Sequence, residues 1–324
     1  MKKIINLILF SVFIIGGGGI VNGATYPIKP VRMLVPSPPG GGTDTLARIV
    51  RENLQQDWPQ PVIVENRGGA SGRIAALAVA KATADGYTLL FTYGGVITTG
   101  LPLFGQLAYD PIKDFSAISM VAHVPNFLVS HPSFKLQNIN EIIKTAKAKP
   151  GSLTHGTSSI GSSSHLSMVL FKQLTGIKML QVSYPGDGPA SIALISGEVP
   201  FAFLNSVVAA PHIISGRLRA IAVSAPQRMN NFGDIPTIQE SGLKGFNALL
   251  FYCVMAPAKT PPAIIRQLHD TINEIIHRNA VLEQFARLGA VAYPMTIEEL
   301  RSYLQTDLDQ WKRVIKNEGI VPEA

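Results

Sequence analysis

The chain has 324 residues, of which 46% are hydrophobic and 15% charged, and its formal net charge is +7. Its lysines and arginines are scattered and form no basic block interleaved with aromatic residues, so the composition disfavours a nucleic-acid-binding surface. The single cysteine, Cys253, excludes an internal disulfide.

The N-terminus has the pattern of a secretory signal. Lys2 and Lys3 precede an apolar run, and small residues follow up to Ala24. We expect residues 1–24 to be a cleaved secretory signal peptide; a retained anchor is the alternative, although the apolar run is short for a membrane span. The remaining chain of roughly 300 residues exceeds what one core usually holds, so two lobes are expected.

The first distinctive stretch is a glycine-rich turn between a strand and a helix. Residues 31–35 predict a buried strand, and the apolar spacing after Thr43 predicts an amphipathic helix. The turn can direct backbone N–H groups toward a carboxylate or phosphate at the positive helix end. An ordinary strand-to-helix turn is the alternative. The candidate ligand-binding residues here are Pro39, Gly40, Gly41, Gly42, Thr43 and Asp44.

Strands and helices alternate through the first part of the chain. Residues 61–65 and 87–93 predict strands, and residues 74–81 predict an alanine-rich helix. This order predicts a parallel α/β sheet, in which ligands bind at the carboxyl ends of the strands. The loops at those ends are 37–42, 66–72 and 94–95.

A second α/β unit follows Pro111. Asn138, with Glu141 three residues later, predicts the start of a helix. The strands predicted in this unit are 118–122, 127–130, 152–156, 179–182, 199–204 and 218–223, and its other helices are 165–174, 190–196 and 209–215.

The last part returns to an apolar strand, residues 249–255, and ends in helices that begin at Thr260, Ala280 and Thr296. We expect this segment to pack on the first unit. The chain then forms two α/β lobes with a ligand cleft between them. Lobe 1 comprises residues 25–125 and 248–324, and lobe 2 comprises residues 126–247.

Two further loops repeat the features of the first. Residues 157–165 are rich in serine and open a helix, so hydroxyl and N–H groups lie at a positive helix end; a serine-rich cap is the alternative. A glycine-bearing loop precedes the helix at residue 190, and Asn205 ends a strand. The candidate ligand-binding residues in these places are Ser158, Ser159, Ser162, Ser163, His165, Tyr184, Gly186, Asp187 and Asn205, together with Phe251; Phe251 and Tyr252 offer aromatic surface late in the chain.

Other chemistries fit poorly. The serine loop lacks the second glycine of a nucleophile elbow, which leaves a Ser/His hydrolase as a weak alternative. The glycines match neither a P-loop nor a Rossmann turn, and the seven histidines lack metal-ligand spacing, so no cofactor and no metal are expected.

Several motifs occur together in order from Tyr26 nearly to the C-terminus, and this combination resembles the substrate receptors of tripartite tricarboxylate transporters, the Bug family. The motifs are Pro38-Pro-Gly-Gly-Gly-Thr-Asp44, Val64-Glu-Asn-Arg67, Asp85-Gly-Tyr-Thr-Leu-Leu90, Tyr109-Asp-Pro-x-Lys-Asp-Phe115, Ser162-x-x-His165-Leu, Asp234-x-Pro-Thr237 and Glu240-x-Gly242.

The resemblance implies a two-lobed periplasmic binding protein fold and a receptor without enzymatic activity. It implies that the loops at 38–44 and 158–165 hold a carboxylate through backbone amides, hydroxyls and waters, and that a membrane permease receives the solute. A sensor that passes its ligand to a signalling partner would have the same fold. We expect a monomer.

The sequence departs from the family pattern at three places, so the ligand's identity does not transfer. They are Gly197-Glu-Val-Pro200, Phe251-Tyr252-Cys253, and the loop from Gly68 to Arg73. In addition, Asp187 stands where the family usually has a small or neutral residue. Like-charge repulsion at this carboxylate would disfavour polycarboxylates, and an amino acid or a nicotinate-like solute would be preferred. The alternative is that Asp187 only starts its helix and points to solvent.

Overall fold

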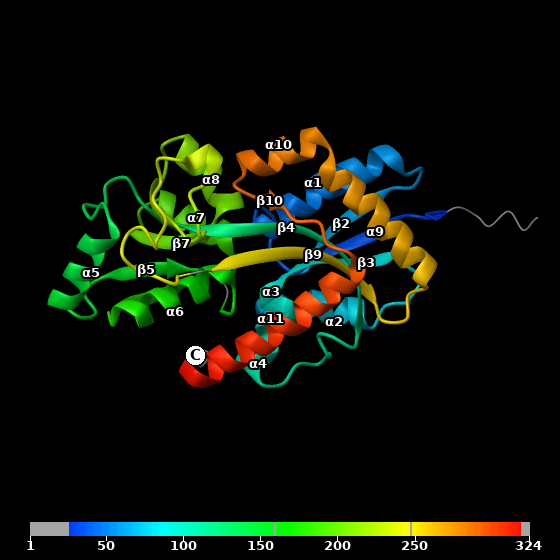
Figure 1. Cartoon of the computed structure of the whole chain (residues 1–324), viewed down its shortest axis with the longest axis horizontal. Coiled ribbons are helices and arrows are strands. Elements are labelled where there is room, and N and C mark those ends of the chain that lie inside the picture. The colour runs from blue at the N-terminus through cyan, green and yellow to red at the C-terminus, as the bar shows by residue number, and fades with distance from the viewer. Residues whose placement is uncertain (1–25, 159, 247, 319–324) are drawn as a thin grey trace, which may run out of the picture.

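The computed structural model describes residues 26–158, 160–246 and 248–318. The predicted signal peptide lies outside this range. A mixed sheet runs through the long axis of the molecule, with helices on both faces (Figure 1). Its strand order is β2-β1-β3-β9-β4-β7-β5-β6, and β8 and β10 also pair with β4.

Lobe 1 is built on three parallel strands. These are β1 (Val31–Val35), β2 (Val62–Asn66) and β3 (Thr88–Tyr93), with the helices α1 (Gly42–Asp57) and α2 (Arg73–Ala80) in the connections. This agrees with the predicted strand-helix alternation. Two short helices follow β3 that the sequence did not predict, α3 (Gly94–Ile97) and α4 (Gly100–Phe104).

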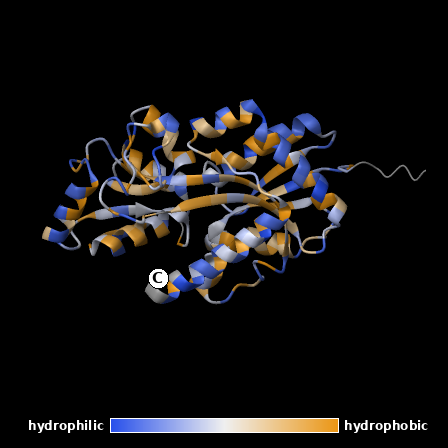
Figure 2. Ribbon diagram, in the orientation of Figure 1, coloured by the Kyte–Doolittle hydropathy of each residue, from blue (hydrophilic) through white to orange (hydrophobic). Residues whose placement is uncertain are grey.

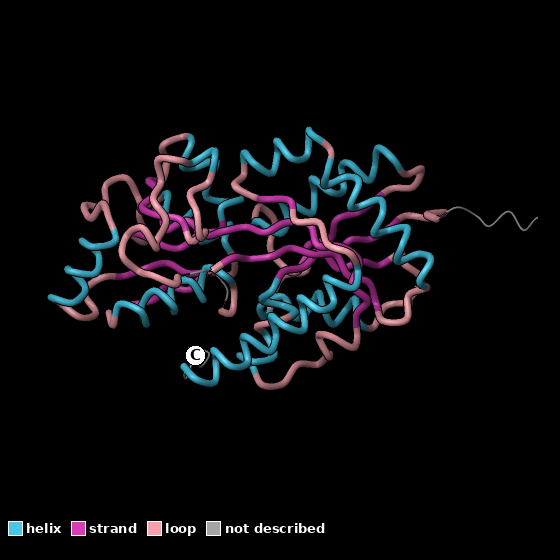
Figure 3. The backbone as a smooth tube through the Cα atoms, in the orientation of Figure 1, coloured by secondary structure: helices cyan, strands magenta, loops and turns pink. Residues whose placement is uncertain are grey.

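Two long strands connect the lobes, and here the prediction needs correction. The expected strands 118–122 and 127–130 are one strand, β4 (Phe115–Ser130), which continues through Pro125 (Figure 3). Its first part pairs antiparallel with β9 (Leu249–Pro257), and from Asn126 onward it pairs with β7 and β8. The proline is tolerated because partners change at this point, where a ladder hydrogen bond is not required.

Lobe 2 contains β5 (Thr154–Thr157), β6 (Leu180–Ser183), β7 (Phe201–Asn205) and β8 (Arg219–Val223). Its helices are α5 (Ile139–Ala148), α6 (Ser163–Thr175), α7 (Asp187–Ile195) and α8 (Ser206–Ile214). Strand β5 is parallel to β6 and β7, as predicted, whereas β4 is antiparallel to its neighbours. Asn138 caps α5 by accepting a hydrogen bond from the Glu141 N–H at 3.0 Å.

The C-terminal segment packs back on lobe 1. Helices α9 (Pro262–His277) and α10 (Asn279–Arg287) precede the short strand β10 (Val291–Ala292), and α11 (Ile297–Glu318) ends the described chain. Helix α11 then extends beneath α6 of lobe 2 (Figure 1), where Trp311 and Ile315 join a small apolar cluster with Leu103 and Leu166.

The apolar side chains divide as expected for two lobes. One large core fills lobe 1, and two smaller cores lie on opposite sides of the lobe 2 sheet. The connecting strands are apolar along most of their length, and charged residues lie on the outer helix faces (Figure 2). The sheet therefore lies behind the loops that line the space between the lobes.

Candidate functional site

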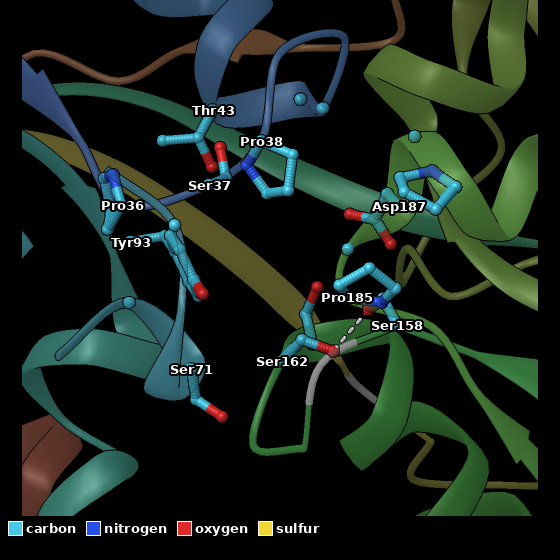
Figure 4. A pocket seen from close by; sticks show the side chains of 18 of the residues that line it. Pro36, Ser37, Pro38, Thr43, Ser71, Tyr93, Ser158, Ser162, Pro185 and Asp187 are labelled. Carbon is cyan, nitrogen blue, oxygen red and sulfur yellow. Dashed lines mark hydrogen bonds between the residues drawn. The ribbon is translucent and has the colours of Figure 1, made fainter. Parts of the chain in front are cut away.

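A cavity of about 240 Å3 lies between the lobes, and strand-to-helix loops from both of them form its wall. The helices α1 and α2 of lobe 1 and α6 and α7 of lobe 2 begin at this wall (Figure 4). Eight of the predicted residues line it: Gly41, Gly42, Thr43, Ser158, Ser162, Ser163, Gly186 and Asp187. Their part in ligand binding stays a prediction.

The glycine turn exposes the beginning of α1. Gly41 is the N-cap and has no side chain to occupy the free N–H groups, so they remain available to a ligand. Asp44 does not line the cavity. Its carboxylate accepts hydrogen bonds from the Gly40 N–H at 3.0 Å and from Asn66 at 2.9 Å, and it pairs with Arg48. Burial favours a higher pKa for Asp44, but these hydrogen bonds outweigh it and lower the pKa below its ordinary value. Asp44 therefore holds the turn in shape.

The serine loop presents hydroxyl groups to the cavity. Ser162 is the N-cap of α6 and accepts from the His165 N–H at 3.2 Å, while its hydroxyl lies 2.6 Å from that of Ser158. The Ser163 hydroxyl donates to Asn126 Oδ1 at 3.2 Å. His165 is buried behind the loop, where its Nδ1 accepts from the Gly161 N–H at 3.2 Å. It supports the loop and is not part of the wall. Ser159 lies outside the described residues.

The third loop contributes Asp187, the first residue of α7. Its carboxylate points into the cavity in Figure 4, and its Oδ1 accepts a hydrogen bond from the Ser164 hydroxyl at 2.7 Å. The alternative, in which the Asp187 side chain points to solvent, is therefore wrong. Burial raises the pKa of Asp187 above its ordinary value, although hydrogen bonds from Ser164 and Ser158 oppose this. Tyr184 turns away from the cavity and donates to Glu198 at 2.8 Å.

Strand β9 places Tyr252, and not Phe251, in the wall. Adjacent residues of a strand point to opposite faces. Phe251 therefore packs against Tyr303 of α11 with ring centroids 5.2 Å apart, whereas the Tyr252 hydroxyl reaches the cavity side. Asn205 lies behind this wall: its amide donates to the Tyr252 hydroxyl at 2.5 Å, and its oxygen caps α8. Of the two aromatic residues expected to offer surface here, Tyr252 lines the cavity and Phe251 does not.

Sequence reasoning left several wall residues out of the candidate list. They come from the end of β1, the end of β3, the loop before α2, the third loop and β9: Pro36, Ser37, Pro38, Gly68, Gly69, Ala70, Ser71, Gly72, Tyr93, Pro185, Gly188, Pro189, Leu250 and Tyr252. Two sequence features could have identified the loop before α2 as part of the wall: it follows a strand end, and it departs from the family pattern. Pro39 and Gly40 are not in the wall, but they lie against Gly188 of the third loop.

The loop before α2 has a strained backbone. Ala70 and Ser71 have φ values of 47° and 54°, a left-handed conformation that costs energy in residues with a Cβ. Arg73 supports the loop, since its Nε donates to the Ala70 carbonyl at 2.7 Å and its guanidinium lies over the Phe104 ring.

The wall has an unusual charge distribution. It contains no lysine, arginine or histidine among the described residues, and Asp187 is its one carboxylate. Positive potential comes from the helix N-termini, whose free N–H groups and dipoles favour an anion. The burial of Tyr93 and Tyr252 raises both phenol pKa values, which keeps these groups neutral. The cavity can therefore hold a carboxylate without a basic side chain.

Over the described part of the chain, no cluster of acidic, histidine or cysteine side chains could hold a metal ion. Likewise, none of the helices in this part is long and apolar enough to cross a membrane.

Two α/β lobes around a cavity lined by helix N-termini define a class, the solute-binding receptors. The solved structure of R. palustris Rpa4515 with adipate has a TM-score of 0.89 and 32% identity, covering 92% of this chain and 100% of that chain. MatC from Rhodopseudomonas palustris with bound malate has a TM-score of 0.84 and 30% identity, covering 90% and 100%.

Sequence comparison gives the family. BugT of Bordetella pertussis is 37% identical over 320 residues, which is 98% of each chain. The model of the tripartite tricarboxylate transporter family receptor matches residues 46–320. The chain belongs to this family of periplasmic solute-binding receptors.

Proposed function

We propose that the protein is a periplasmic receptor that captures one small carboxylate between its lobes and delivers it to the permease of a tripartite tricarboxylate transporter. The observation that carries this proposal is the convergence of helix N-termini from both lobes on one cavity without a basic side chain in its described wall. The adipate and malate bound to the two similar structures support the ligand class.

Capture works through groups that each lobe contributes separately. The free N–H groups of Gly42 and Thr43 bind one carboxylate oxygen, and the Ser163 hydroxyl, which rotates from Asn126 Oδ1 to the ligand, binds the other from the opposite lobe. Each charge-assisted hydrogen bond contributes about 1.5 to 3 kcal/mol. Because a ligand satisfies both lobes at once, it favours the closed arrangement.

We place the lobe boundaries at residues 25–125 with 248–324 and at 126–247. The change of β4 partners after Pro125 supports this division. Residues 1–24 serve as the cleaved signal peptide. The receptor acts as a monomer and catalyses no reaction; amino acids and nicotinate-like compounds are among its expected solutes.

Native mass spectrometry of the freshly purified protein tests the ligand class, because it measures the mass of any solute that the protein has retained from the cell. Calorimetry then compares Ser163→Ala with Ser215→Ala, a control at an exposed hydroxyl at the C-cap of α8. We expect Ser163→Ala to weaken binding about tenfold, equivalent to roughly 1.4 kcal/mol, and the control to change nothing. A retained solute without an acidic group would contradict the proposal.

Delivery requires a cellular test. Deletion of the cognate permease should abolish uptake of the identified solute while the purified receptor still binds it. Unchanged uptake, together with a transcriptional response that depends on the receptor, would favour a sensing role.

A further inference from the structure

Among the wall residues that the structure describes, Asp187 is the one whose charge opposes the capture of an anion. It projects from the N-terminus of α7 into a cavity that is otherwise built to attract a carboxylate. A carboxylate placed there repels the bound ligand unless something compensates for its charge.

The protein itself supplies little compensation. The hydroxyls of Ser164 and Ser158 donate hydrogen bonds to Asp187, and no ion pair between described residues includes it. Aspartate in a first helical turn is stabilised by the helix dipole, but that role does not require the side chain to face the cavity. A partly buried carboxylate without a cationic partner carries a desolvation cost.

Lobe 1 presents aromatic rings to the same space. Tyr93 and Tyr252 line the same cavity as Asp187. In Figure 4, Tyr93 lies across the cavity from Asp187. A carboxylate together with neutral aromatic rings is a setting that stabilises an ammonium group, through charge pairing and cation-π attraction.

The cavity therefore has two poles. Helix N-termini and hydroxyls favour a negative group, and Asp187 with the tyrosines favours a positive one. We propose that the natural ligand is zwitterionic, with its carboxylate at the beginnings of α1 and α6 and its ammonium against Asp187. This inference rests on the proposed function and narrows it, because a nicotinate-like compound or a dicarboxylate carries no ammonium group.

Matched ligands of defined charge test the inference directly on the purified receptor. 6-Aminohexanoate, hexanoate and adipate each have six carbons and differ only at the distal carbon, which carries an ammonium, is a methyl, or is a carboxylate. The series 4-aminobutyrate, butyrate and succinate repeats the comparison at a shorter length. Aspartate and malate form a further pair, in which the carbon next to a carboxylate carries an ammonium or a hydroxyl. Calorimetry at neutral pH gives the affinity of each.

We expect the ammonium member of at least one matched set to bind tenfold or more tightly than its partners. Asp187→Asn should remove this preference and improve binding of the dicarboxylate. Asp270→Asn, at an exposed position on α9, removes the same charge outside the cavity and should leave the preference unchanged. Thermal unfolding of each variant shows whether it is folded.

The outcomes separate the two proposals. Equal affinity for the ammonium and methyl ligands, or a preference that survives in Asp187→Asn, overturns the zwitterion inference and leaves carboxylate capture intact. A lower melting temperature with affinities reduced equally for all ligands would mean that Asp187 only stabilises α7, which also overturns it. Failure of every carboxylate to bind would contradict the proposed function and, with it, the inference.

Discussion

At the scale of single residues, Gly42 shows how closely the lobes approach at the site. A Cβ added to it would lie 2.7 Å from the Tyr252 hydroxyl and 2.9 Å from Asn205 Oδ1. The Asn205 Nδ2 donates a hydrogen bond to this hydroxyl at 2.5 Å, and the two residues lie on β7 and β9. The backbone of Gly42 can reach a ligand only because it carries no side chain.

We therefore expect Gly42→Ala to lower the free energy of unfolding by about 1 to 3 kcal/mol through overpacking and to weaken ligand binding. Gly41→Ala is the matched control, because its added Cβ would meet only Pro38 and Ser37 atoms at 3.6 Å and beyond. Its effect on stability should stay within about 0.5 kcal/mol. Urea unfolding measures both, and equal losses would contradict this account.

Asp187 predicts a pH dependence with a definite sign. In the free protein, at pH values between the ordinary pKa and the raised folded pKa, the folded state holds a proton that the unfolded state has released, so stability falls as the pH rises through this interval. An ammonium ligand binds the ionised form. Its affinity should therefore rise with pH through that pKa and then level off.

Calorimetry with 6-aminohexanoate at a series of pH values above the ligand's own carboxyl pKa checks this, because the charges of the ligand then stay constant. Ser158, Ser164, Tyr93 and Tyr252, the groups that face Asp187, do not titrate there. Hexanoate should show no such rise, and Asp187→Asn should give a flat profile. The same slope in the variant would assign the titration to another group.

At the scale of elements, α11 contacts both lobes through side chains, in addition to the backbone connection that β4 and β9 provide. Leu166 of α6 packs with Ile315 of α11 and Leu103 of α4, and the Thr99 hydroxyl donates to the Gly161 carbonyl at 3.1 Å. Gly161 lies in the serine loop. Contacts of α11 and α4 therefore help to hold the serine hydroxyls in place.

Leu166→Ala should cost about 2 to 4 kcal/mol of stability, since it leaves a cavity in this cluster, and should also weaken ligand binding by loosening the serine loop. Leu174→Ala provides a control on the same helix, because Leu174 is 47% exposed. Urea unfolding and calorimetry are the measurements. Affinity unchanged in a destabilised Leu166→Ala would show that the cluster does not position the loop.

At the scale of the whole molecule, β4 belongs to the sheets of both lobes. Its pairing changes from β9 to β7 and β8 without a break, so neither sheet is complete without it. Loss of either lobe exposes part of the strand that the other requires. The two lobes should consequently unfold together.

Urea unfolding followed by two probes tests this cooperativity. The fluorescence of Trp58 and Trp311 reports on α1 and α11, whereas far-ultraviolet circular dichroism reports on all elements. We expect coincident transitions. A fluorescence midpoint clearly separated from the dichroism midpoint would mean that the lobes unfold independently.

The secondary structure and the loop positions of this molecule were largely predictable, because they depend on residues that are close together in the sequence. The alternation of strands and helices, the cap at Asn138, and the glycine and serine loops at strand ends follow from periodicity, helix-end chemistry and backbone sterics. Those are short-range effects, and the sequence displays them directly. By themselves they determined two α/β units and the anion-attracting loops.

Tertiary structure decided what depends on partners distant in the chain. Pairing with β9 and then with β7 and β8 makes β4 one strand, and the register of β9 turns Tyr252 rather than Phe251 toward the cavity. In the folded chain Asn205 and His165 also lie behind the cavity wall, and the Asp187 carboxylate points into the cavity. A strand's period of two shows that adjacent side chains diverge, but only the neighbouring strands and helices determine which face becomes the binding site.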